Sequence, residues 1–447
     1  MSEWLARNLF LPLHERLRGR STLVCYRSLR RTEKLDRTGL RAHQDDKLLT
    51  LLRHCWKDVP FYRARFAALG IKDVSDISLD LFRRLPPVER LDVRESVEEM
   101  VARGFKGQLI RHTTGGSTGQ PLVFYTDLEK ESWHNAAKLR GRAWFGVAPG
   151  SRQVDFWGSP VELSKLDATR RFKDRWFLNH IVLSAFDLTD EGLARDAEVL
   201  RRFQPRLVYG YPTVLYHVAL FMERRLELFG DWRPQLVTCT SEVMYPNQRY
   251  KMAEVFGCPI GDEYGSRDGG HLAHECPAGG LHIAAEHVLL EVDQPNEEGV
   301  GELLVTNLDG FGMPLLRYRV GDRVKLLNEP CPCGMTLPTL GQIAGRTSDF
   351  IVGRDGAPIH SAALRYVLRE LSDLKQFKII QRQDLSLDVL LVRDPPYPEK
   401  KLQEIRGKMH RTLRMEVPVR FSFPENIPPG KSGKYVTLVS EAQQLCQ

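Results

Sequence analysis

The sequence predicts an α/β protein. It has a large N-terminal α/β domain with a mainly parallel sheet and a β-rich subdomain, followed by a small α+β domain at the C-terminus. Short apolar strands alternate with helices between residues 152 and 265, which is typical of a parallel sheet. Strands then follow one another without helices, and the pattern changes again after residue 346. We expect domains at 1–346 and 347–447, with the β-rich subdomain at about 283–345.

The large domain is expected to begin with helices. Leu48, Leu51, Leu52 and Cys55 recur at helical spacing in QDDKLLTLLRHCWKDV. Strands are expected at RQVDFWG, RLVYGY, QLVTCTSE and CPIGDEYG. Between them lie two predicted helices, TDEGLARDAEVLRRF, with Thr189 as its N-cap, and the segment from Pro212 to Gly230.

Strand patterns dominate the β-rich subdomain, at HVLLEV, GELLVTNL and RYRVGDRVKLL. The C-terminal domain is expected to contain a helix at LRYVLREL, a hairpin made of FKIIQRQ and SLDVLLV, a helix at PEKKLQEIRGKMHRTLRME and a strand at PVRFSF.

Composition narrows the class of protein. The chain is 42% hydrophobic and 27% charged, as in soluble globular proteins. No apolar run reaches the roughly 18 residues that a membrane span needs, so stable membrane insertion is not expected. The net charge of +7 suits a polyanionic small molecule, and because the basic residues are scattered, nucleic acid is not favoured. Eight cysteines without a secretory signal favour reduced thiols in the cytoplasm. The oligomeric state stays open.

A glycine-rich segment, TTGGSTGQP (113–121), combines three glycines with four hydroxyl side chains. Such a segment can surround an anion with amides and hydroxyls, or it can be an ordinary polar turn. It lacks the Gly-Lys-Ser/Thr ending of a P-loop, so the usual NTPase interpretation fails.

Four later segments carry candidate ligand-binding side chains. In GDEYGSRDGG, Tyr264 offers a flat face for a base, Asp262 an acceptor for an exocyclic amine and Asp268 a ligand for Mg²⁺. In LLRYRVGDRV, Asp322 is expected on a turn between two strands, where a carboxylate can take both ribose hydroxyls. GRTSDFIV falls at the expected domain seam, and SGK near the C-terminus carries Lys434. Each alone is also typical of a turn, a linker or a solvated lysine.

Taken in this order over nearly the whole chain, the five segments resemble the adenylate-forming superfamily of acyl- and aryl-CoA synthetases. The chain is most similar to the phenylacetate–CoA ligase branch, including its capsular-polysaccharide-biosynthesis members. The cues are HCWKDVPFYRARF, TTGGSTGQP and the pair of ECP…LH with CPCG.

The resemblance implies roles for named positions. Lys434 would be catalytic, bridging the carboxylate and the α-phosphate, and residues 347–447 would form a small, mobile α+β lid domain that rotates about Ser348. The implied ATP-binding residues are Thr113, Thr114, Gly115, Gly116, Ser117, Thr118, Gly119, Ser241, Glu242, Asp262, Tyr264, Gly265, Ser266, Asp322 and Arg346. Three positions depart from the superfamily's usual pattern: Leu122 follows the loop's proline in place of lysine, Asp268 replaces the common glutamate, and Ser348 stands where Asp or Lys is frequent.

A structural zinc site is a separate prediction. Cys276 and His282 in ECPAGGLH, with Cys331 and Cys333 in EPCPCGM, supply the three thiols and one imidazole that tetrahedral zinc requires. Free cysteines in turns are the alternative, and His271 and His274 are nearby substitutes for His282.

The expected reaction is ATP-dependent activation of a carboxylic acid as acyl-AMP, with release of pyrophosphate and transfer to a thiol, most simply that of CoA. An aryl or hydrophobic acid is suggested by four aromatic residues near FWGSP and VYGYP: Phe156, Trp157, Tyr209 and Tyr211. Transfer to an amine or a carrier-protein thiol, and a non-catalytic scaffold that retains the fold, are the alternatives.

Overall fold

The computed structural model describes residues 2–113, 122–158, 168–185, 187–327 and 329–344. Within 350–442 it describes all but 354–357, 361–363, 365–366, 369–370, 372–373, 375, 394, 414 and 428–437. Side chains at 168–170, 342, 344, 350, 358, 360 and 376 are also left undescribed. In the described part, no helix is both long and apolar enough to cross a membrane.

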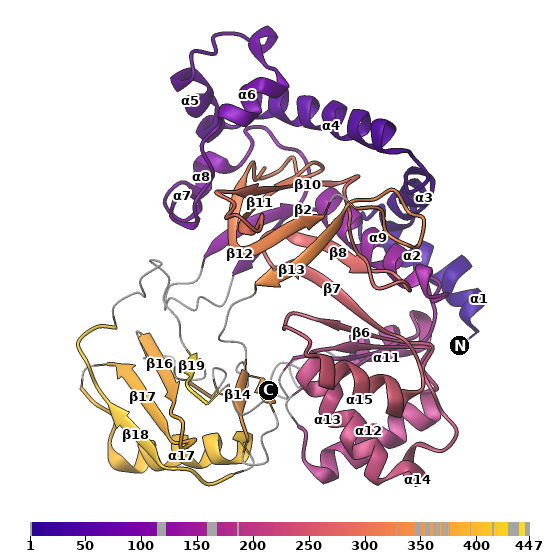
Figure 1. The fold of residues 1–447 in the computed structure, drawn as a ribbon, viewed down its shortest axis with the longest axis vertical. Coiled ribbons are helices and arrows are strands. Elements are labelled where there is room, and N and C mark those ends of the chain that lie inside the picture. The colour runs from indigo at the N-terminus through magenta and orange to yellow at the C-terminus, as the bar shows by residue number, and fades with distance from the viewer. Residues whose placement is uncertain are drawn as a thin grey trace.

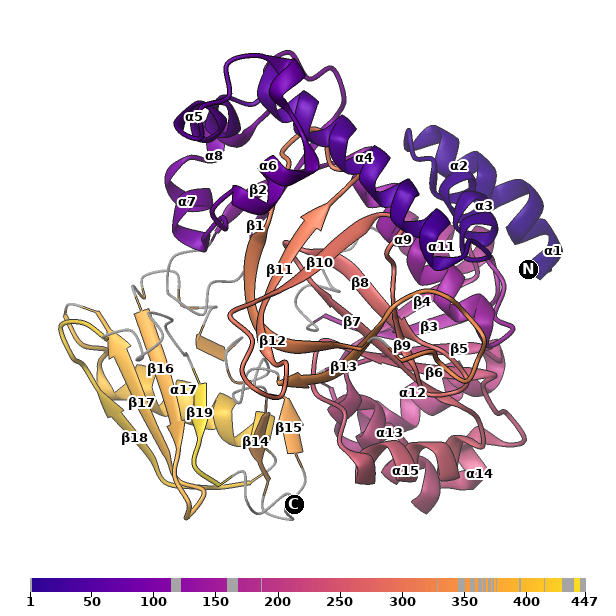
Figure 2. The same ribbon diagram turned by 45° about the horizontal axis from the view of Figure 1, so that its top comes forward.

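Helices dominate the first hundred residues, as predicted. The longest, α4 (Arg37–Asp58), contains the predicted segment and begins where the Asp36 carboxylate accepts a hydrogen bond from Gly39 N. It lies over β10 (Val288–Asp293), and the Gln44 amide donates to the Ala285 carbonyl at 2.8 Å (Figures 1 and 2). The other helices and helical turns are α1 (Glu3–Leu5), η1 (Ala6–Phe10), α2 (Leu11–Leu17), α3 (Thr22–Thr32), α5 (Pro60–Ala68), η2 (Val74–Asp76), α6 (Leu79–Arg84), α7 (Arg90–Glu95) and α8 (Val97–Met100).

A short antiparallel hairpin flanks the glycine-rich segment. It consists of β1 (Leu109–Thr113) and β2 (Val123–Asp127), and its last pair joins Thr113 to Val123. The Asp127 carboxylate then caps α9 (Leu128–Trp144) by accepting from Lys130 N at 2.8 Å.

One eleven-stranded sheet organises the large domain, in the order β10-β11-β12-β13-β9-β8-β7-β6-β5-β3-β4. Strands β3 to β7 are parallel to one another, and the remaining pairings are antiparallel, so the β-rich segment continues the same hydrogen-bonded sheet. The other bounds are β3 (Gln153–Phe156), β4 (His180–Leu183), β5 (Leu207–Gly210), β6 (Leu236–Thr240), β7 (Ile260–Ser266), β8 (Gly270–Glu275), β9 (Leu281–Ile283), β11 (Gly301–Asn307), β12 (Tyr318–Leu327) and β13 (Thr339–Ala344).

Helices cover both faces of the parallel strands. On one face, α12 (Asp190–Phe203), α13 (Pro212–Arg224) and α15 (Pro246–Phe256) bury an apolar core. Thr189 caps α12, as predicted, and the helix predicted up to Gly230 is divided into α13 and α14 (Leu226–Phe229). On the opposite face, Phe145 and Val147 after α9 pack against β5 and β6. Helix α11 (Ala168–Phe177) precedes β4.

The C-terminal domain is small and has its own core. Its four-stranded sheet has the order β18-β17-β16-β19, and the predicted hairpin and helix are confirmed as β16 (Gln376–Gln381), β17 (Leu387–Val392) and α17 (Glu399–Leu413). The remaining strands are β14 (Phe350–Val352), β15 (Pro358–His360), β18 (Val419–Ser422) and β19 (Leu438–Ser440). The predicted helix at 364–371 and the boundary at 346/347 fall wholly or partly outside the described residues.

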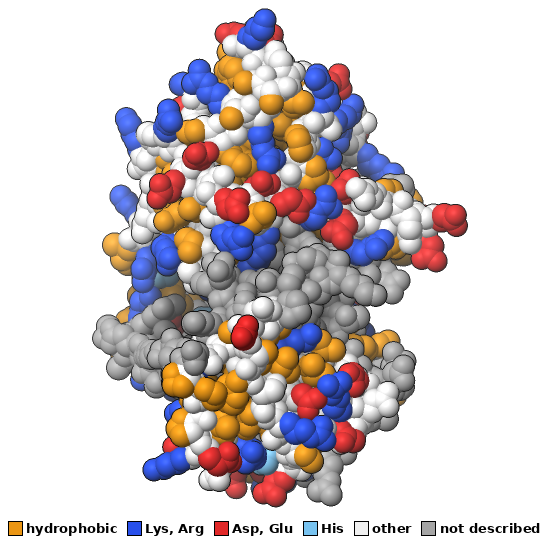
Figure 3. All heavy atoms as spheres, turned by 90° about the vertical axis from the view of Figure 1, so that its left-hand side faces the viewer, with side chains coloured by type: hydrophobic (Ala, Val, Ile, Leu, Met, Phe, Trp, Pro, Cys, Tyr) orange, Lys and Arg blue, Asp and Glu red, His pale blue; other side chains and the backbone are white. Residues whose placement is uncertain are grey.

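The small domain lies beside the parallel part of the sheet (Figures 1 and 2). Its Val352 and Ala442 form one apolar cluster with Tyr245, the residue that precedes α15. Figure 3 shows the side of the molecule that includes this domain. On that face the described Lys and Arg side chains are interspersed with Asp and Glu, as the scattered basic residues in the sequence suggested.

Candidate functional site

Two of the predicted ATP-binding residues meet across the sheet. The Tyr264 hydroxyl on β7 donates to Asp322 Oδ2 on β12 at 2.9 Å. Asp322 does not lie on a turn between strands, as the sequence suggested. It lies within the single strand β12, next to Gly321 with φ of +88°, where the register with β11 shifts. A bulge therefore presents this carboxylate, because the extra residues change its direction without ending the strand.

Ser241 and Glu242 follow the carboxyl end of β6, the edge where ligands of open α/β sheets bind. Ser241 has φ of +68°, an uncommon conformation for a residue with a side chain. Glu242 Oε2 accepts hydrogen bonds from Thr213 N at 3.0 Å and Thr213 Oγ1 at 2.8 Å. Glu242 thus fixes the start of α13 relative to β6.

Asp262 is half-buried beside another carboxylate. Its backbone N donates to Glu275 Oε2 at 2.9 Å, and Arg249 Nη2 lies 2.7 Å from the same oxygen. Burial, reinforced by Glu275, raises the pKa of Asp262 to about 7. This carboxyl group therefore takes up a proton close to neutral pH.

Asp268 already holds two hydroxyl groups. Ser266 Oγ donates to Asp268 Oδ1 at 2.8 Å and the Tyr318 hydroxyl donates to Oδ2 at 2.7 Å, while only 7% of the residue is exposed. Each carboxylate oxygen keeps a second lone pair, so Asp268 as a ligand for Mg²⁺ stays a prediction. At Gly265, a Cβ atom would lie 2.4 Å from the Gly270 carbonyl oxygen, so the turn between β7 and β8 leaves no room for a side chain there.

Three of the four predicted acyl-pocket residues form one aromatic wall. The Trp157 ring stacks on Tyr211, with ring centroids 4.5 Å apart, and lies 5.8 Å from Tyr209. Phe156 is not part of this wall. It points to the opposite face of β3 and is fully buried in the core against α12 and α13, because successive strand residues alternate between faces.

A charged cluster beside this wall was missed by sequence reasoning. Glu263 on β7 lies 3.3 Å from Lys138 Nζ and accepts a hydrogen bond from the Tyr209 hydroxyl at 3.0 Å. Burial alone would raise the pKa of Glu263, but nearby Lys138 chiefly brings it well below its usual range. The sequence did contain a signal for Glu263, because successive side chains of a strand point to opposite faces of the sheet. Glu263 lies between Asp262 and Tyr264, so its side chain is expected on the face opposite to theirs.

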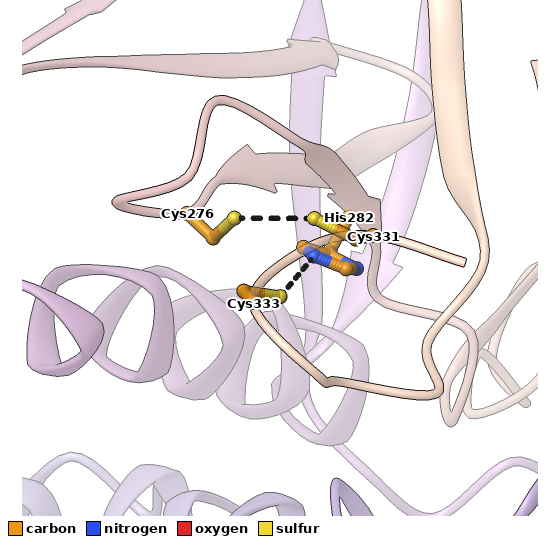
Figure 4. Close-up of side chains that lie close together, drawn as sticks. All are labelled: Cys276, His282, Cys331 and Cys333. Atoms are coloured by element: carbon orange, nitrogen blue, oxygen red, sulfur yellow. Dashed lines mark hydrogen bonds between the residues drawn. The ribbon is translucent and has the colours of Figure 1, made fainter. Parts of the chain in front are cut away.

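The four predicted zinc ligands come together (Figure 4). Their ligand atoms all lie within 4.8 Å of one another. Cys276 Sγ is 3.7 Å from Cys331 Sγ, and His282 Nε2 is 3.2 Å from Cys333 Sγ. The other ring nitrogen, His282 Nδ1, is 2.9 Å from the Leu337 carbonyl oxygen, which is the outer contact that commonly orients a metal-binding histidine. His271 and His274 lie outside the cluster.

The remaining predicted site residues lie outside the described residues. These are Thr114, Gly115, Gly116, Ser117, Thr118, Gly119, Arg346, Ser348 and Lys434. Thr113 is described at the end of β1, and Arg267, in the turn after β7, helps burial to lower the pKa of His112 on the same strand. The β1–β2 hairpin therefore lies near the end of β7.

Known proteins resemble both parts of the chain. Residues 351–441 match the family model of the CapK C-terminal domain. Protein CapK of Staphylococcus aureus is 26% identical over 362 residues, covering 80% of each chain. Phenylacetate-coenzyme A ligase of Thermus thermophilus is 25% identical over 369 residues, covering 80% of this chain and 81% of the relative.

The fold also matches solved structures. A 2-hydroxyisobutyryl-CoA ligase crystallised with 2-HIB-AMP and CoA in its thioesterification state is 20% identical, with a TM-score of 0.60 over 90% of this chain and 91% of the other. The same enzyme in its postadenylation state gives a TM-score of 0.56. The chain is therefore similar to proteins of the phenylacetate–CoA ligase-like branch, which includes CapK, and it has their fold.

Proposed function

We propose that this protein is an AMP-forming acid–CoA ligase: it activates a carboxylic acid with ATP as acyl-AMP, releases pyrophosphate and transfers the acyl group to the thiol of CoA. The observation that carries the proposal is the assembly of Ser241, Tyr264 and Asp322 at the carboxyl edge of the parallel strands, beside the hairpin that bears the glycine-rich segment. Its curated relatives include phenylacetate-coenzyme A ligases. A cytoplasmic location would give it reduced cysteines and ATP.

The residues divide the work between binding and charge stabilisation. Tyr264 would cover the adenine and Asp322 would accept hydrogen bonds from the ribose hydroxyls. The acid's carboxylate oxygen attacks the α-phosphorus, the bond to the pyrophosphate oxygen breaks, and pyrophosphate leaves with the electron pair. Lys434 would hold the attacking carboxylate against the α-phosphate, and the segment 113–119 would receive the leaving phosphates through its amides and hydroxyls.

The aromatic wall supports an aryl acid as substrate. Trp157 is 36% exposed, whereas the Tyr209 ring beneath it is nearly buried, so the stacked rings lead from the surface toward the interior. A flat substrate ring would extend this stack.

Pyrophosphate exchange into ATP, measured across aryl and acyl acids with and without CoA, tests the reaction. We expect acid-dependent exchange and CoA consumption, and Lys434→Ala should abolish exchange while ATP binding persists. Lys431→Ala, in the same segment, is the matched control and should retain exchange. Exchange without CoA consumption would indicate an amine or carrier-thiol acceptor, and no exchange with any acid would favour a non-catalytic scaffold.

We also propose that Cys276, His282, Cys331 and Cys333 hold one structural zinc ion. The donor set fits tetrahedral zinc, and four protein ligands leave no position for a substrate. At Gly280, a Cβ atom would lie 2.5 Å from Cys331 Sγ, so a glycine is needed for the two segments to meet.

Elemental analysis of the purified protein should find about one zinc per chain. Cys331→Ser should lose the metal, whereas Cys258→Ser, which changes a half-buried thiol outside the cluster, should keep it. Far less than one equivalent in the unaltered protein would contradict the site.

A further inference from the structure

The face of the parallel strands that α9 covers carries buried polar side chains. Tyr209 on β5, Thr238 on β6 and Glu263 on β7 share this face. Thr238 is paired in register with Tyr209 and with Gly261, so it is a diagonal neighbour of Glu263. Thr238 is fully buried and Glu263 is 4% exposed. Parallel strands inside an α/β domain are normally apolar on both faces, so buried polar side chains on one face are unusual and indicate a function.

One carboxylate oxygen of Glu263 makes nearly all of this residue's polar contacts in the layer. Glu263 Oε1 lies 3.3 Å from Lys138 Nζ, accepts from the Tyr209 hydroxyl at 3.0 Å and lies 3.7 Å from His271 Nδ1. The second oxygen, Oε2, has only the Arg142 guanidinium at 3.9 Å, which is too far for a hydrogen bond. Because Lys138 holds Glu263 in its ionised form, Oε2 is a buried acceptor.

Among the described residues, three buried nitrogens around Glu263 lack a hydrogen-bond partner: Arg142 Nε, His271 Nδ1 and His274 Nε2. So do two buried side-chain oxygens of the layer. They are Glu263 Oε2 and Thr238 Oγ1. Leaving such atoms unpaired costs roughly 1–3 kcal/mol each. Their side chains are nine-tenths buried or more, so bulk solvent does not supply the missing bonds.

The two atoms specify the chemistry of a partner. A carboxylate oxygen only accepts, whereas a threonine hydroxyl can donate. A hydroxyl group satisfies both, since it donates to Glu263 Oε2 and accepts from Thr238 Oγ1. An ammonium group could donate to both atoms, but it would add a positive charge beside Lys138 and Arg142, and a carboxylate would be repelled by Glu263.

Exposure connects this layer to the aromatic wall. It falls from 36% at Trp157 to 7% at Tyr209 and 4% at Glu263, and the Tyr209 hydroxyl is itself bonded to Glu263. An aryl ring stacked along the wall would therefore direct its far end toward Glu263 and Thr238.

We propose that the acid activated by this protein carries a hydroxyl group on its ring or tail, which Glu263 and Thr238 bind at the inner end of the aromatic wall. This inference rests on the proposed function. It narrows the predicted substrate from an aryl or hydrophobic acid to a hydroxylated aryl acid.

Matched acids test the proposal. Pyrophosphate exchange is measured with phenylacetate and with its 3-hydroxy and 4-hydroxy forms. We expect one hydroxylated acid to have a kcat/KM at least about tenfold above that of phenylacetate, since it fills two unmade hydrogen bonds. Thr238→Val, which keeps the shape and removes the hydroxyl, should reduce that ratio several-fold. Equal or better use of phenylacetate by the unaltered enzyme would overturn the proposal.

Thr22→Val is the matched control, because Thr22 Oγ1 is also buried without a hydrogen-bond partner but lies at the start of α3. It should leave the ratio unchanged. If Thr238→Val behaves like Thr22→Val, the buried atoms hold water only and the proposal fails. A second measurement, the thermal stabilisation of the protein by each free acid without ATP, separates this proposal from the proposed reaction. Absence of pyrophosphate exchange with all acids contradicts the proposed reaction. Stabilisation by a hydroxylated acid but not by phenylacetate still supports the hydroxyl-binding site, and equal stabilisation by both contradicts it.

Discussion

Asp262 and Glu263 are neighbours in β7, yet their carboxyl groups lie on opposite faces of the sheet and their pKa values move in opposite directions. On the face covered by α12, α13 and α15, burial raises the pKa of Asp262 to about 7. On the face covered by α9, burial opposes ionisation of Glu263, but nearby Lys138 lowers its pKa well below the usual range.

The same division runs through the neighbouring strands. Val154, Phe156, Val208 and Cys239 belong to the apolar core on the first face. Asp155, Tyr209 and Thr238 alternate with them toward α9. One face therefore supplies stability through close packing, whereas the other keeps polar groups buried, which is costly unless a ligand uses them.

The largest expected effect is on the apolar face. Phe156→Ala should lower the free energy of unfolding by about 3–5 kcal/mol, because a fully buried ring leaves a cavity. Urea denaturation measures the change. A loss below about 1 kcal/mol would contradict a core role for Phe156 and would return it to the candidate acyl pocket.

Asp262→Asn tests whether the raised pKa of Asp262 makes the free energy of unfolding depend on pH. Between about pH 4 and 7 the folded protein binds more protons at Asp262 than the unfolded chain does, so this group makes stability fall as pH rises through that window. Unfolding free energies of the unaltered protein and the variant should differ in slope, by about 2–4 kcal/mol over the window. Parallel curves would show that the carboxyl group titrates normally.

Gly141→Ala tests how closely α9 approaches the polar face. A Cβ atom at Gly141 would lie 2.2 Å from His274 Cγ, so the helix would have to shift, at a cost of about 1–3 kcal/mol. Gly407→Ala is the control, since its Cβ atom would meet only the end of Arg411 at 3.6 Å in α17 and should stabilise that helix by about 0.5–1 kcal/mol. Thermal unfolding should therefore shift in opposite directions for the two variants.

The smallest expected effect is that of Tyr209→Phe. Loss of one buried hydrogen bond to the ionised Glu263 should cost about 1.5 kcal/mol, because the ring and its stack on Trp157 remain. Chemical denaturation and the pyrophosphate exchange assay together check it. A loss as large as that for Phe156→Ala would mean that the two faces do not differ in their contribution to stability.

Much of the fold could be predicted from local patterns. Short apolar segments that alternate with helices located β3, β5, β6 and β7, and Thr189 located the start of α12. The four metal-binding candidates were found from residue type alone, since few other uses require three thiols and an imidazole in two short turns. Asp322 was placed on a turn because Gly321 precedes it, whereas pairing with β11 and β13 extends the strand through that glycine.

The sequence by itself determined the order of elements, the resemblance to the CoA ligases and the four residues of the Cys/His cluster, because these depend on residue type and spacing along the chain. Only the tertiary structure decided which face each side chain occupies and what it meets there. Phe156 lies in the apolar core instead of the aromatic wall, and Glu263 lies in the buried charged layer. Which face of the sheet each of these side chains occupies is fixed by strand pairing with segments that lie far away in the sequence.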